Sequence, residues 1–377
     1  MQIISIAEEK KMYNTVEDVQ DLVERIKESA ATLKGIDLSE NSFSPEALEQ
    51  VLIELSKIEE IETVIFKGIF TQRVKEQVYP SLQSIVKYIT PLKKIVYFDI
   101  SDNALSFNGM EILAPMIEKM HVLKHLVMNN NGIGIDGGVF LAKALENLSK
   151  ESTALESLEV GRNRLEESAT KLGKALELFP CLDSLKIYQN SINTINIGNL
   201  LTSLGCLSMR ILDISDNFLL EYGSKVLSES MKNWPIEYMN IADCIMSDKG
   251  LAVFESALVE HISVQGELIS EKEIDMSYND ITEESVDILR AIVRKSNDTK
   301  LVLTGNEIGK QEMQLIMKDA ENTTCEIEFE EEEDDLMFSS EEKEKTISDE
   351  EDVMRKLEEQ ISEITLKKSE ENTSFSQ

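Results

Sequence analysis

The sequence of 377 residues has few basic residues, few prolines and few glycines. Its 38 Lys and Arg stand against 71 Asp and Glu, which gives a formal net charge of −33. Nucleic-acid binding requires clustered Lys and Arg, so it is excluded as the main function. With only 6 Pro and 16 Gly the chain is neither collagen-like nor a linker, and its 42% hydrophobic residues are enough for a sizeable core.

The four cysteines lie far apart in the sequence and form no CxxC pair. Cys181, Cys206, Cys244 and Cys325 have no nearby histidine to complete a zinc site, so we expect them to be reduced and structural. No apolar run approaches the roughly 20 residues that a membrane helix needs, and the charged N-terminal segment does not match a signal peptide. We therefore expect a cytoplasmic protein, with a perinuclear location left open.

The sequence also lacks the usual catalytic and nucleotide-binding motifs. It contains no phosphate loop, GxGxxG fingerprint, GxSxG elbow or HExxH helix. His121, His125 and His261 are not spaced as metal ligands or as members of a triad, although a partner can contact His125. We therefore expect no active site within the chain, no cofactor and no metal.

What the sequence does contain is an internal repeat of the form LxxLxLxxNxL. Most copies carry the template asparagine, which occurs at Asn41, Asn103, Asn131, Asn163, Asn190, Asn217, Asn279 and Asn306. Cys244 replaces it in one copy, where a thiol can still donate a hydrogen bond. A weaker copy around Ile61, Val64 and Phe66 has no asparagine at all.

The spacing of the repeat predicts the fold. From residue 131 the asparagines are mostly 27 residues apart, with insertions before residues 163 and 279. Such a unit leaves roughly 16 residues after a short strand, which is enough for a helix. Segments 138–148, 169–179 and 223–234 have the apolar period of helices. We predict an α/β leucine-rich-repeat solenoid, a ribonuclease-inhibitor-like horseshoe with parallel strands on its concave face and helices on its convex face.

The sequence predicts three parts. Residues 1–30 are expected to form a helical cap, since apolar residues share one helical face, namely Val16, Val19, Leu22, Val23 and Ile26. Residues 31–325 would form about ten repeat units. Residues 326–377 carry 20 acidic and 6 basic residues and are predicted to be a largely disordered acidic tail. A short helical pattern within the tail consists of Met354, Leu357, Ile361 and Ile364.

Acidic residues recur at equivalent positions of the repeat. Those predicted on strands are Asp99, Glu159, Asp213 and Asp275, and those predicted at or near the turn after the strand are Asp102, Asp183, Asp216 and Asp243. A column of such carboxylates would steer a basic partner to the concave face. The alternative, weighted equally, is that a chain this acidic has carboxylates everywhere.

One segment of the second copy breaks the repeat. The sequence IFKGIFTQRVKEQVYPSLQ replaces the asparagine turn with a loop that contains Arg73 and Lys75. This loop resembles the second repeat of the Ran GTPase-activating protein family. The resemblance extends from about residue 30 to 325, includes the acidic tail, and continues in NNNGIG (129–134), GRNRLE (161–166), YQNSI (188–192), LDISDN (212–217) and NWPIEYMNIADCIMSDKG (233–250).

The resemblance implies an activity exerted on a partner. The protein would bind the small GTPase Ran in its GTP form and stimulate GTP hydrolysis, in support of nucleocytoplasmic transport. Arg73 and Asn131 would be the key residues, which hold the glutamine and switch regions of the GTPase in place. GTP and magnesium would belong to Ran. We expect a monomer that binds Ran, with or without a Ran-binding protein, and neither nucleic acid nor a membrane.

The roles of the individual residues have alternatives. Arg73 is either a positioning contact or an arginine finger, and as a loop residue it is expected to be replaceable without loss of stability. Asn131 either acts on the GTPase or only caps its turn, in which case Asn130 is the more exposed amide. Gln72 stands where the family usually has Gly. The other residues predicted to bind the partner are Lys75, Asp102, Asn130, Arg162, Asp216 and Asp243.

Two other classes of protein compete with this interpretation. One is an acidic leucine-rich-repeat histone chaperone, whose repeats are usually shorter than those found here. The other is a ribonuclease-inhibitor-like scaffold for an unrelated partner, which the Arg73 loop does not specifically support. The sequence contains no WPP-type segment and no large SUMO-acceptor domain, so we expect no docking at the nuclear pore.

Overall fold

The computed structural model describes residues 2–7, 9–263, 272–296 and 298–329, without the side chains of residues 260–263. The chain divides into a repeat-containing unit, Met1–Glu330, and a second unit, Glu331–Gln377. The second unit lies outside the described residues, as do nearly all of the predicted acidic tail and its short helical pattern.

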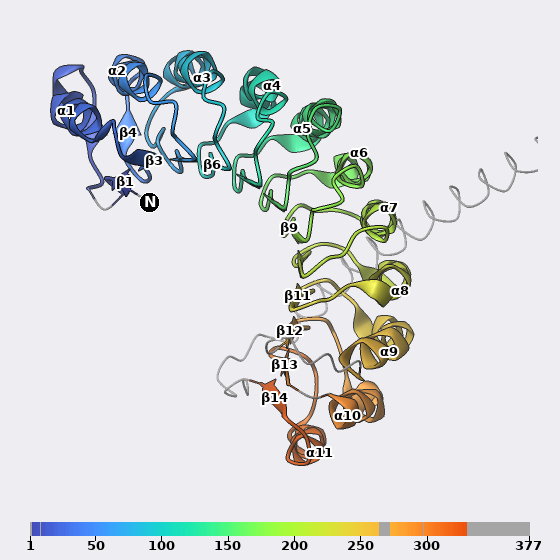
Figure 1. Ribbon diagram of the computed structural model, residues 1–377. Helices are drawn as coiled ribbons and strands as arrows, with labels where there is room; N and C mark the ends of the chain where they lie inside the picture. The colour runs from blue at the N-terminus through green and yellow to red at the C-terminus, as the bar shows by residue number, and fades with distance from the viewer. Residues whose placement is uncertain (1, 8, 264–271, 297, 330–377) are drawn as a thin grey trace, which may run out of the picture. The chain divides into compact units, whose positions relative to one another are not determined.

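Twelve of the described strands form a single parallel sheet in which sequence neighbours are also neighbours in space (Figure 1). They are β1 (Gln2–Ser5), β3 (Leu33–Asp37), β5 (Thr63–Ile65), β6 (Tyr97–Asp99), β7 (His125–Val127), β8 (Ser157–Glu159), β9 (Ser184–Lys186), β10 (Ile211–Asp213), β11 (Tyr238–Asn240), β12 (Lys272–Asp275), β13 (Thr299–Val302) and β14 (Cys325–Glu328). A separate parallel pair consists of β2 (Met12–Tyr13) and β4 (Ser42–Phe43).

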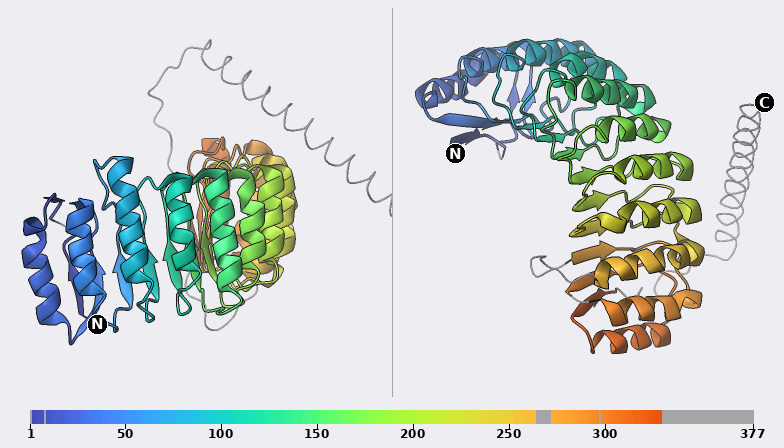
Figure 2. Two further views of the ribbon diagram at one scale, coloured as in Figure 1. Left: turned by 90° about the horizontal axis from the view of Figure 1, so that it is seen from above. Right: turned by 45° about the vertical axis from the view of Figure 1, so that its right-hand side comes forward.

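A helix follows each strand of the large sheet as far as β13 and lies on the side away from the concave strand surface (Figures 1 and 2). The α-helices are α1 (Gln20–Ser29), α2 (Pro45–Leu55), α3 (Lys75–Ile89), α4 (Ser106–Ile117), α5 (Gly134–Leu148), α6 (Ala169–Leu176), α7 (Thr194–Leu204), α8 (Leu220–Ser230), α9 (Ser247–Ser263), α10 (Val286–Lys295) and α11 (Lys310–Ala320). Short 3-10 turns are η1 (Glu17–Val19), η2 (Glu166–Ser168), η3 (Met231–Asn233) and η4 (Glu283–Ser285). The predicted α/β solenoid is confirmed.

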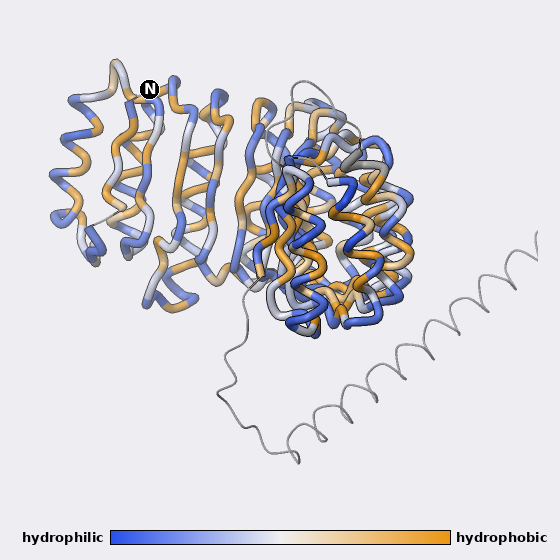
Figure 3. Tube along the Cα trace, turned by 90° about the horizontal axis from the view of Figure 1, so that it is seen from below, coloured by the Kyte–Doolittle hydropathy of each residue, from blue (hydrophilic) through white to orange (hydrophobic). Residues whose placement is uncertain are grey.

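The core lies between the sheet and the helices. In each short strand the middle residue faces inward and is paired with its equivalent in the next unit, as Phe98 is with Leu126 and Leu126 with Leu158. All three side chains are buried. Most helices alternate between hydrophobic and hydrophilic segments along the chain, which leaves an apolar stripe toward the sheet (Figure 3).

The template asparagines are buried and connect the units through hydrogen bonds. Asn131 Nδ2 donates to the carbonyls of Met128 in its own unit and Ile100 in the preceding one, both at 3.1 Å. Its Oδ1 accepts from Asn103 N at 3.0 Å. Cys244 donates its thiol to the Ile214 carbonyl at 3.4 Å, which confirms the predicted substitution. The same asparagine pattern recurs along the solenoid, and we call it the asparagine ladder.

The two ends of the repeat region differ from the predicted boundaries. The stretch predicted as a helical cap begins with β1, which pairs in parallel with β3, and only η1 and α1 within it are helical. The cap is therefore an additional strand-and-helix unit. At the other end β14 runs to Glu328, three residues beyond the predicted limit at 325. The added residues pair in parallel with β13.

Candidate functional site

Every unit turns its backbone in the same way just after its strand. The residue directly before the template asparagine, or before its replacement, has a φ between 50° and 70°. We call these residues the rim row: Glu40, Gly68, Asp102, Asn130, Arg162, Gln189, Asp216, Asp243, Tyr278 and Gly305. Left-handed backbone is costly for most side chains and least so for Gly, Asn and Asp, which fill six of the ten places.

The rim row is held in place by its own backbone. From Glu40 to Tyr278 each rim N–H donates to a carbonyl of the next unit, as Asn130 N does to Gly161 O at 2.8 Å and Arg162 N to Tyr188 O at 2.9 Å. The side chains take no part in these bonds. The turn therefore presents one side chain per unit at a fixed position, which suits a surface that recognises a partner.

The neighbouring residues Asn130 and Asn131 have opposite environments. Asn131 is 1% exposed, and its amide is fully used by the asparagine ladder. Asn131 therefore caps its turn in this structure, because its polar atoms bond within the solenoid, and its action on a partner stays a prediction. Asn130 is exposed, and its Nδ2 donates to Asp102 Oδ1 at 2.8 Å. The accessible amide of this turn is that of Asn130.

Arg73 lies in the loop between β5 and α3, but its side chain does not extend into solvent. Its Nε donates to Ser42 Oγ at 2.9 Å, and one terminal nitrogen donates to the carbonyls of Ser42 at 3.1 Å and Tyr13 at 3.2 Å. Partial burial lowers the pKa of the guanidinium, although arginine stays charged. The expectation that Arg73 is a freely replaceable loop residue is wrong, because the side chain fastens the loop to the β2–β4 pair.

The residues on either side of Arg73 are exposed. Gln72 has a φ of 62°, Val74 is 58% exposed, and Lys75 is the first residue of α3. Where a template asparagine would stand, the loop has Ile69, and Asn103 Oδ1 accepts from Phe70 N at 3.2 Å instead. The ladder therefore continues past the interruption, while the loop itself is free to face a partner.

A polar hollow of about 480 Å³ adjoins the Arg73 loop. Residues from the cap, the first rim positions and the loop line it, namely Lys10, Lys11, Met12, Glu40, Ser42, Lys67, Gly68, Thr71, Gln72 and Asp102. Lys10 lies 3.6 Å from Glu40, and Lys67 lies 3.6 Å from Asp102. Asp102 therefore contacts both Lys67, which lines the hollow beside the loop, and Asn130 of the rim row. These contacts form one polar surface from the loop to the rim row.

Further along, the rim row changes from mixed to acidic. Arg162 and Gln189 are exposed, and no ion pair holds the Arg162 side chain within the described part of the chain. The next two rim residues are Asp216 and Asp243. Partial burial, assisted by the neighbouring Asp243 carboxylate, raises the pKa of Asp216. The predicted positions of Arg162, Asp216 and Asp243 at the rim are confirmed, whereas their binding roles stay predictions.

The predicted column of strand carboxylates is present, but three of its four members are buried or ion-paired. Asp99 and Asp213 are 7% and 9% exposed and accept hydrogen bonds from Ser101 and Ser215, and burial raises the pKa of both. Glu159 forms an ion pair with Lys186 at 3.0 Å. These groups therefore contribute less free surface charge than a count of carboxylates suggests.

The predicted position of Asp183 at the rim is wrong. Asp183 precedes β9, at the opposite end of the strand from the rim row, and pairs with Arg210 Nε at 2.7 Å. Because the chain crosses the sheet in one direction in every unit, residues before and after a strand lie on different edges. Asp183 therefore belongs to a group of ion pairs at the edge of the sheet where the strands begin, together with Arg210 and Glu237.

Other predicted features are placed as follows. His125 is half-buried on β7, with its ring centroid 6.0 Å from that of Tyr97. Cys181 and Cys206 are exposed, whereas Cys244 and Cys325 are buried, and none of the four forms a disulfide. Across the described ranges no His, Cys, Asp and Glu cluster could hold a metal, and no helix is long and apolar enough to cross a bilayer.

Sequence reasoning missed the partners of Arg73 and the lysines of the polar hollow. Tyr13 and Ser42 lie 60 and 31 residues from Arg73, so no local pattern connects them. Lys67 was detectable, since it directly precedes the rim position of its unit.

By its fold, the chain is a leucine-rich-repeat protein whose strands end in a regular row of turn residues. It is 27% identical over 306 residues to Ran GTPase-activating protein 1 of Saccharomyces cerevisiae, a match that covers 76% of this chain and 73% of the yeast protein. Ran GTPase-activating proteins are thus homologues of this chain, which confirms the resemblance.

Two further relatives match over shorter stretches. Ran GTPase-activating protein 1 of Xenopus laevis is 30% identical over 190 residues, which cover 48% of this chain and 33% of the relative. Ran GTPase-activating protein 2 of Caenorhabditis elegans is 28% identical over 200 residues, which cover 50% and 21%. The chain thus matches about a third and a fifth of the lengths of these two. No protein-family model matches the sequence.

Among solved structures, the chain aligns with a TLR13–ssRNA13 complex at a TM-score of 0.49 and 13% identity, over 79% of this chain and 36% of that one. A yeast Rad7–Elc1 complex aligns at a TM-score of 0.44 and 10% identity, over 77% and 75%.

Proposed function

We propose that this protein is a GTPase-activating protein for Ran, which binds the GTP form and stimulates hydrolysis by the GTPase itself. The observation that carries the proposal is the match to the yeast Ran GTPase-activating protein over 76% of the chain. The Arg73 loop and the rim row supply the surface. GTP and magnesium belong to the partner, and the protein acts as a regulator in the cytoplasm.

The arrangement of the loop supports ordering of the partner over an arginine finger. A finger must reach the transferred phosphoryl group in trans. Arg73 would have to give up its bonds to Ser42 and Tyr13 before it could do so. We propose that Arg73 positions the loop and that Val74 and Lys75, which are exposed beside it, meet the GTPase.

Asn130 is the amide that we propose to contact a mobile element of Ran. A carboxamide offers both a donor and an acceptor, so it can hold a glutamine or tyrosine side chain without introducing charge. The Asp102 carboxylate fixes the orientation of the Asn130 amide through its 2.8 Å bond. In Ras-type GTPases the GTPase's own glutamine orients the attacking water, so a contact that orders this glutamine can stimulate hydrolysis without an arginine finger.

The test is single-turnover hydrolysis of GTP by purified Ran with catalytic amounts of the protein. Rho-type and Ras-type GTPases serve as controls for specificity. Stimulation confined to Ran is the expected result. Its absence in a folded sample would reject the proposal, and binding of core histones would then favour the acidic chaperone, which no feature described here supports.

A comparison of two variants locates the contact. Asn130→Ala should reduce stimulation while the helical circular dichroism and the melting temperature stay close to those of the parent. Arg162→Ala should weaken association and reduce its salt dependence, since it removes an exposed charge of the same row. Full activity in both variants would show that the rim row is not the surface that contacts Ran.

A further inference from the structure

Both neighbours of Asn130 in the sequence use their side chains within the solenoid. Asn129 Oδ1 accepts from Gly161 N at 2.7 Å, and Asn129 Nδ2 donates to Glu159 Oε2 at 3.2 Å. Asn131 belongs to the asparagine ladder, and Asn130 N itself donates to Gly161 O. The backbone of Asn130 is therefore held from both sides, and the rotation of its side chain is the freedom that remains.

The Asp102 carboxylate restricts that rotation. Asp102 N donates to Asn129 O at 2.9 Å, which fixes the separation of these two successive rim residues, Asp102 and Asn130. A carboxylate only accepts hydrogen bonds, so it faces the NH₂ end of the Asn130 amide, whose Nδ2 donates to Asp102 Oδ1 at 2.8 Å. The carbonyl oxygen of the Asn130 amide is therefore turned away from Asp102.

The second oxygen of the Asp102 carboxylate has a different partner. Lys67 Nζ lies 3.6 Å from Asp102 Oδ2, while Oδ1 receives the bond from Asn130. The side chains of Lys67 and Asp102 are 45% and 36% exposed, so this ion pair contributes little to stability. Its effect is to hold the plane of the carboxylate between an ammonium group and an amide.

The outward side of the Asn130 amide is open to a partner. Among the residues that the structure describes, none donates a hydrogen bond to Asn130 Oδ1. Gly132, two residues further on, has a φ of 57°, and a β-carbon placed there would meet no atom within 4 Å. A partner can therefore approach this turn closely, and the atom that Asn130 offers to it is a hydrogen-bond acceptor.

We propose that Asp102, itself oriented by Lys67, is a positioning residue that presents the carbonyl oxygen of Asn130 to Ran. The group of Ran that is recognised at this place is then a hydrogen-bond donor, and a carboxylate or phosphate oxygen is excluded from it. The inference rests on the proposed GAP activity. Asp102 acts through Asn130, so its contribution disappears when the Asn130 amide is removed.

The first test is a double-mutant cycle, measured as single-turnover GTP hydrolysis by Ran at limiting and at saturating amounts of the protein. Glycine is a suitable replacement, because Gly68 and Gly305 already occupy rim positions with φ of 63° and 70°. Asp102→Gly should lower the saturating rate roughly two- to tenfold, which is the cost of ordering one mobile side chain. Asn130→Gly should lower it further, and D102G/N130G should equal N130G.

An exchange of the two side chains tests the direction of the hydrogen bond. In D102N/N130D an amide donates to a carboxylate, which again turns an acceptor oxygen outward. This variant should therefore stimulate Ran more strongly than N130G. It should also exceed N130D alone, which places two carboxylates side by side.

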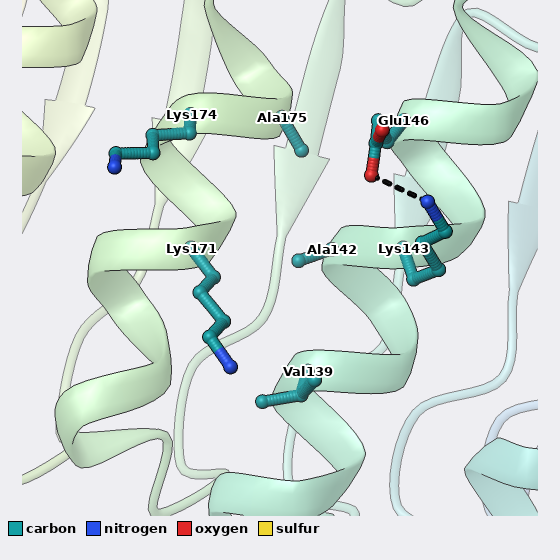
Figure 4. Close-up of a pocket in the computed structure, with 7 residues that line it drawn as sticks. All are labelled: Val139, Ala142, Lys143, Glu146, Lys171, Lys174 and Ala175. Carbon is teal, nitrogen blue, oxygen red and sulfur yellow. Dashed lines mark hydrogen bonds and ion pairs between the residues drawn. The ribbon is translucent and has the colours of Figure 1, made fainter.

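The contribution of Lys67 has a matched control on another face of the molecule. Lys67→Met should lower the saturating rate less than Asp102→Gly does, because an exposed ion pair is weak. Lys174→Met removes the same charge beside a hollow of about 410 Å³ between α5 and α6, where the Lys174 side chain points away from the facing helix (Figure 4). The control should stimulate Ran as the parent does.

A second readout does not depend on Ran. In the NMR spectrum of the isotope-labelled protein, the side-chain amide of Asn130 is identified by its absence from N130G. Its donating proton should lie downfield of the other amide proton, and the difference should shrink in D102G. The matched control is E40G, which removes the carboxylate of another rim residue that also lies 3.6 Å from a lysine, Lys10. It should leave the Asn130 signal unchanged.

Several results would overturn the proposal. They are a D102G variant as active as the parent, a further loss when D102G is added to N130G, a D102N/N130D variant no better than N130G, and an Asn130 signal that is the same in D102G and the parent. A change confined to the half-saturating amount of protein would make Asp102 a binding contact instead. If the parent does not stimulate Ran, the GAP proposal fails, while the NMR spectra still decide whether Asp102 orients the amide.

Discussion

The central units and the N-terminal units join their turns by different means. From Asn103 to Asn217 each turn is tied to the next by a buried asparagine whose amide is fully used. Around the Arg73 loop that asparagine is replaced by Ile69, and an arginine side chain connects the loop to the cap instead. The polar atoms of the template asparagines in the regular stretch are thus used by the fold, whereas rim residues beside them, such as Asn130, stay exposed. In the interrupted stretch the neighbours of the connecting residue stay exposed, and a functional surface becomes possible.

The largest expected effect is on the regular side of this comparison. Asn131→Ala removes two donated bonds and one accepted bond from a buried site. Each unsatisfied buried group costs about 1–3 kcal/mol, so the variant should lose roughly 2–4 kcal/mol of unfolding free energy. Urea unfolding followed by circular dichroism measures the loss. Asn130→Ala, one residue away, is the control and should lose only about 1 kcal/mol, mostly because alanine tolerates the φ of 53° less well than asparagine. Equal losses would contradict the separation of the two roles.

The next effect is on the interrupted side. Arg73→Ala removes three hydrogen bonds from a half-buried guanidinium and should destabilise the protein by about 1–2 kcal/mol. It should also reduce Ran stimulation at least tenfold, because the loop is no longer fastened. Thermal melts and single-turnover hydrolysis measure the two effects.

Two controls sharpen the Arg73 experiment. Arg73→Lys keeps the charge but loses the planar fork, so it should recover little of either property. Lys75→Ala leaves the fastening intact and should change activity without changing the melting temperature. An Arg73→Ala variant that is inactive but as stable as the parent would indicate direct contact with the GTPase instead of positioning.

A smaller effect concerns the buried strand carboxylates of the regular stretch, Asp99 and Asp213. Burial raises the pKa of Asp213 above the ordinary aspartate value of 3.8, so the folded state binds a proton more tightly than the unfolded one. Stability is therefore lost as pH rises from below 3.8 through the raised value, and the penalty is fully present at neutral pH. Asp213→Asn should raise the melting temperature at pH 7, and the difference should disappear near pH 3.

Another unit of the solenoid already has asparagine at this strand position. Asn240 occupies the equivalent strand position, and its Oδ1 accepts from Ala242 N at 3.0 Å, as Asp213 Oδ1 does from Ser215 N at 3.1 Å. The turn therefore tolerates an amide in place of the carboxylate. A lower melting temperature for Asp213→Asn at pH 7 would show that the hydrogen bonds from Ser215 to the charged carboxylate stabilise the fold by more than burial of the charge costs.

The smallest effect is expected at Gln72. Its φ of 62° costs about 1 kcal/mol relative to glycine, while glycine increases the entropy of the unfolded chain by about 0.5–1 kcal/mol. Gln72→Gly should thus change the unfolding free energy by under about 0.5 kcal/mol, measured in urea. A large loss would show that the Gln72 side chain, which lines the polar hollow, has an unrecognised partner.

The fold was predictable because its information is local and repeated. The spacing of Leu126, Asn131 and their equivalents identifies strand, turn and helix within each unit. β1 was missed because residues 1–30 contain no template asparagine, although the pair Ile4 and Ile6 has the LxL spacing of a strand. The repeat template thus identifies a unit reliably only when the template asparagine is present.

The site was only partly predictable. The motif NNNGIG marks the turn at residues 129–134, but which asparagine is exposed depends on the backbone conformation of Asn130. The contacts of Arg73 with Ser42 and Tyr13 span 31 and 60 residues and follow from the stacking of whole units. Asp183 was placed at the wrong edge of the sheet because it comes before its strand, β9, whereas the rim residues come after theirs.

The rim row has an evolutionary consequence. Its side chains take part in neither the core nor the asparagine ladder, and residues as different as Glu40, Arg162 and Tyr278 occupy it in one chain. Each turn is therefore a position at which mutation can change what the protein recognises while leaving its folding intact. A lineage of such proteins can acquire a new partner by single substitutions along one edge, and duplication of a unit adds one more position to the series.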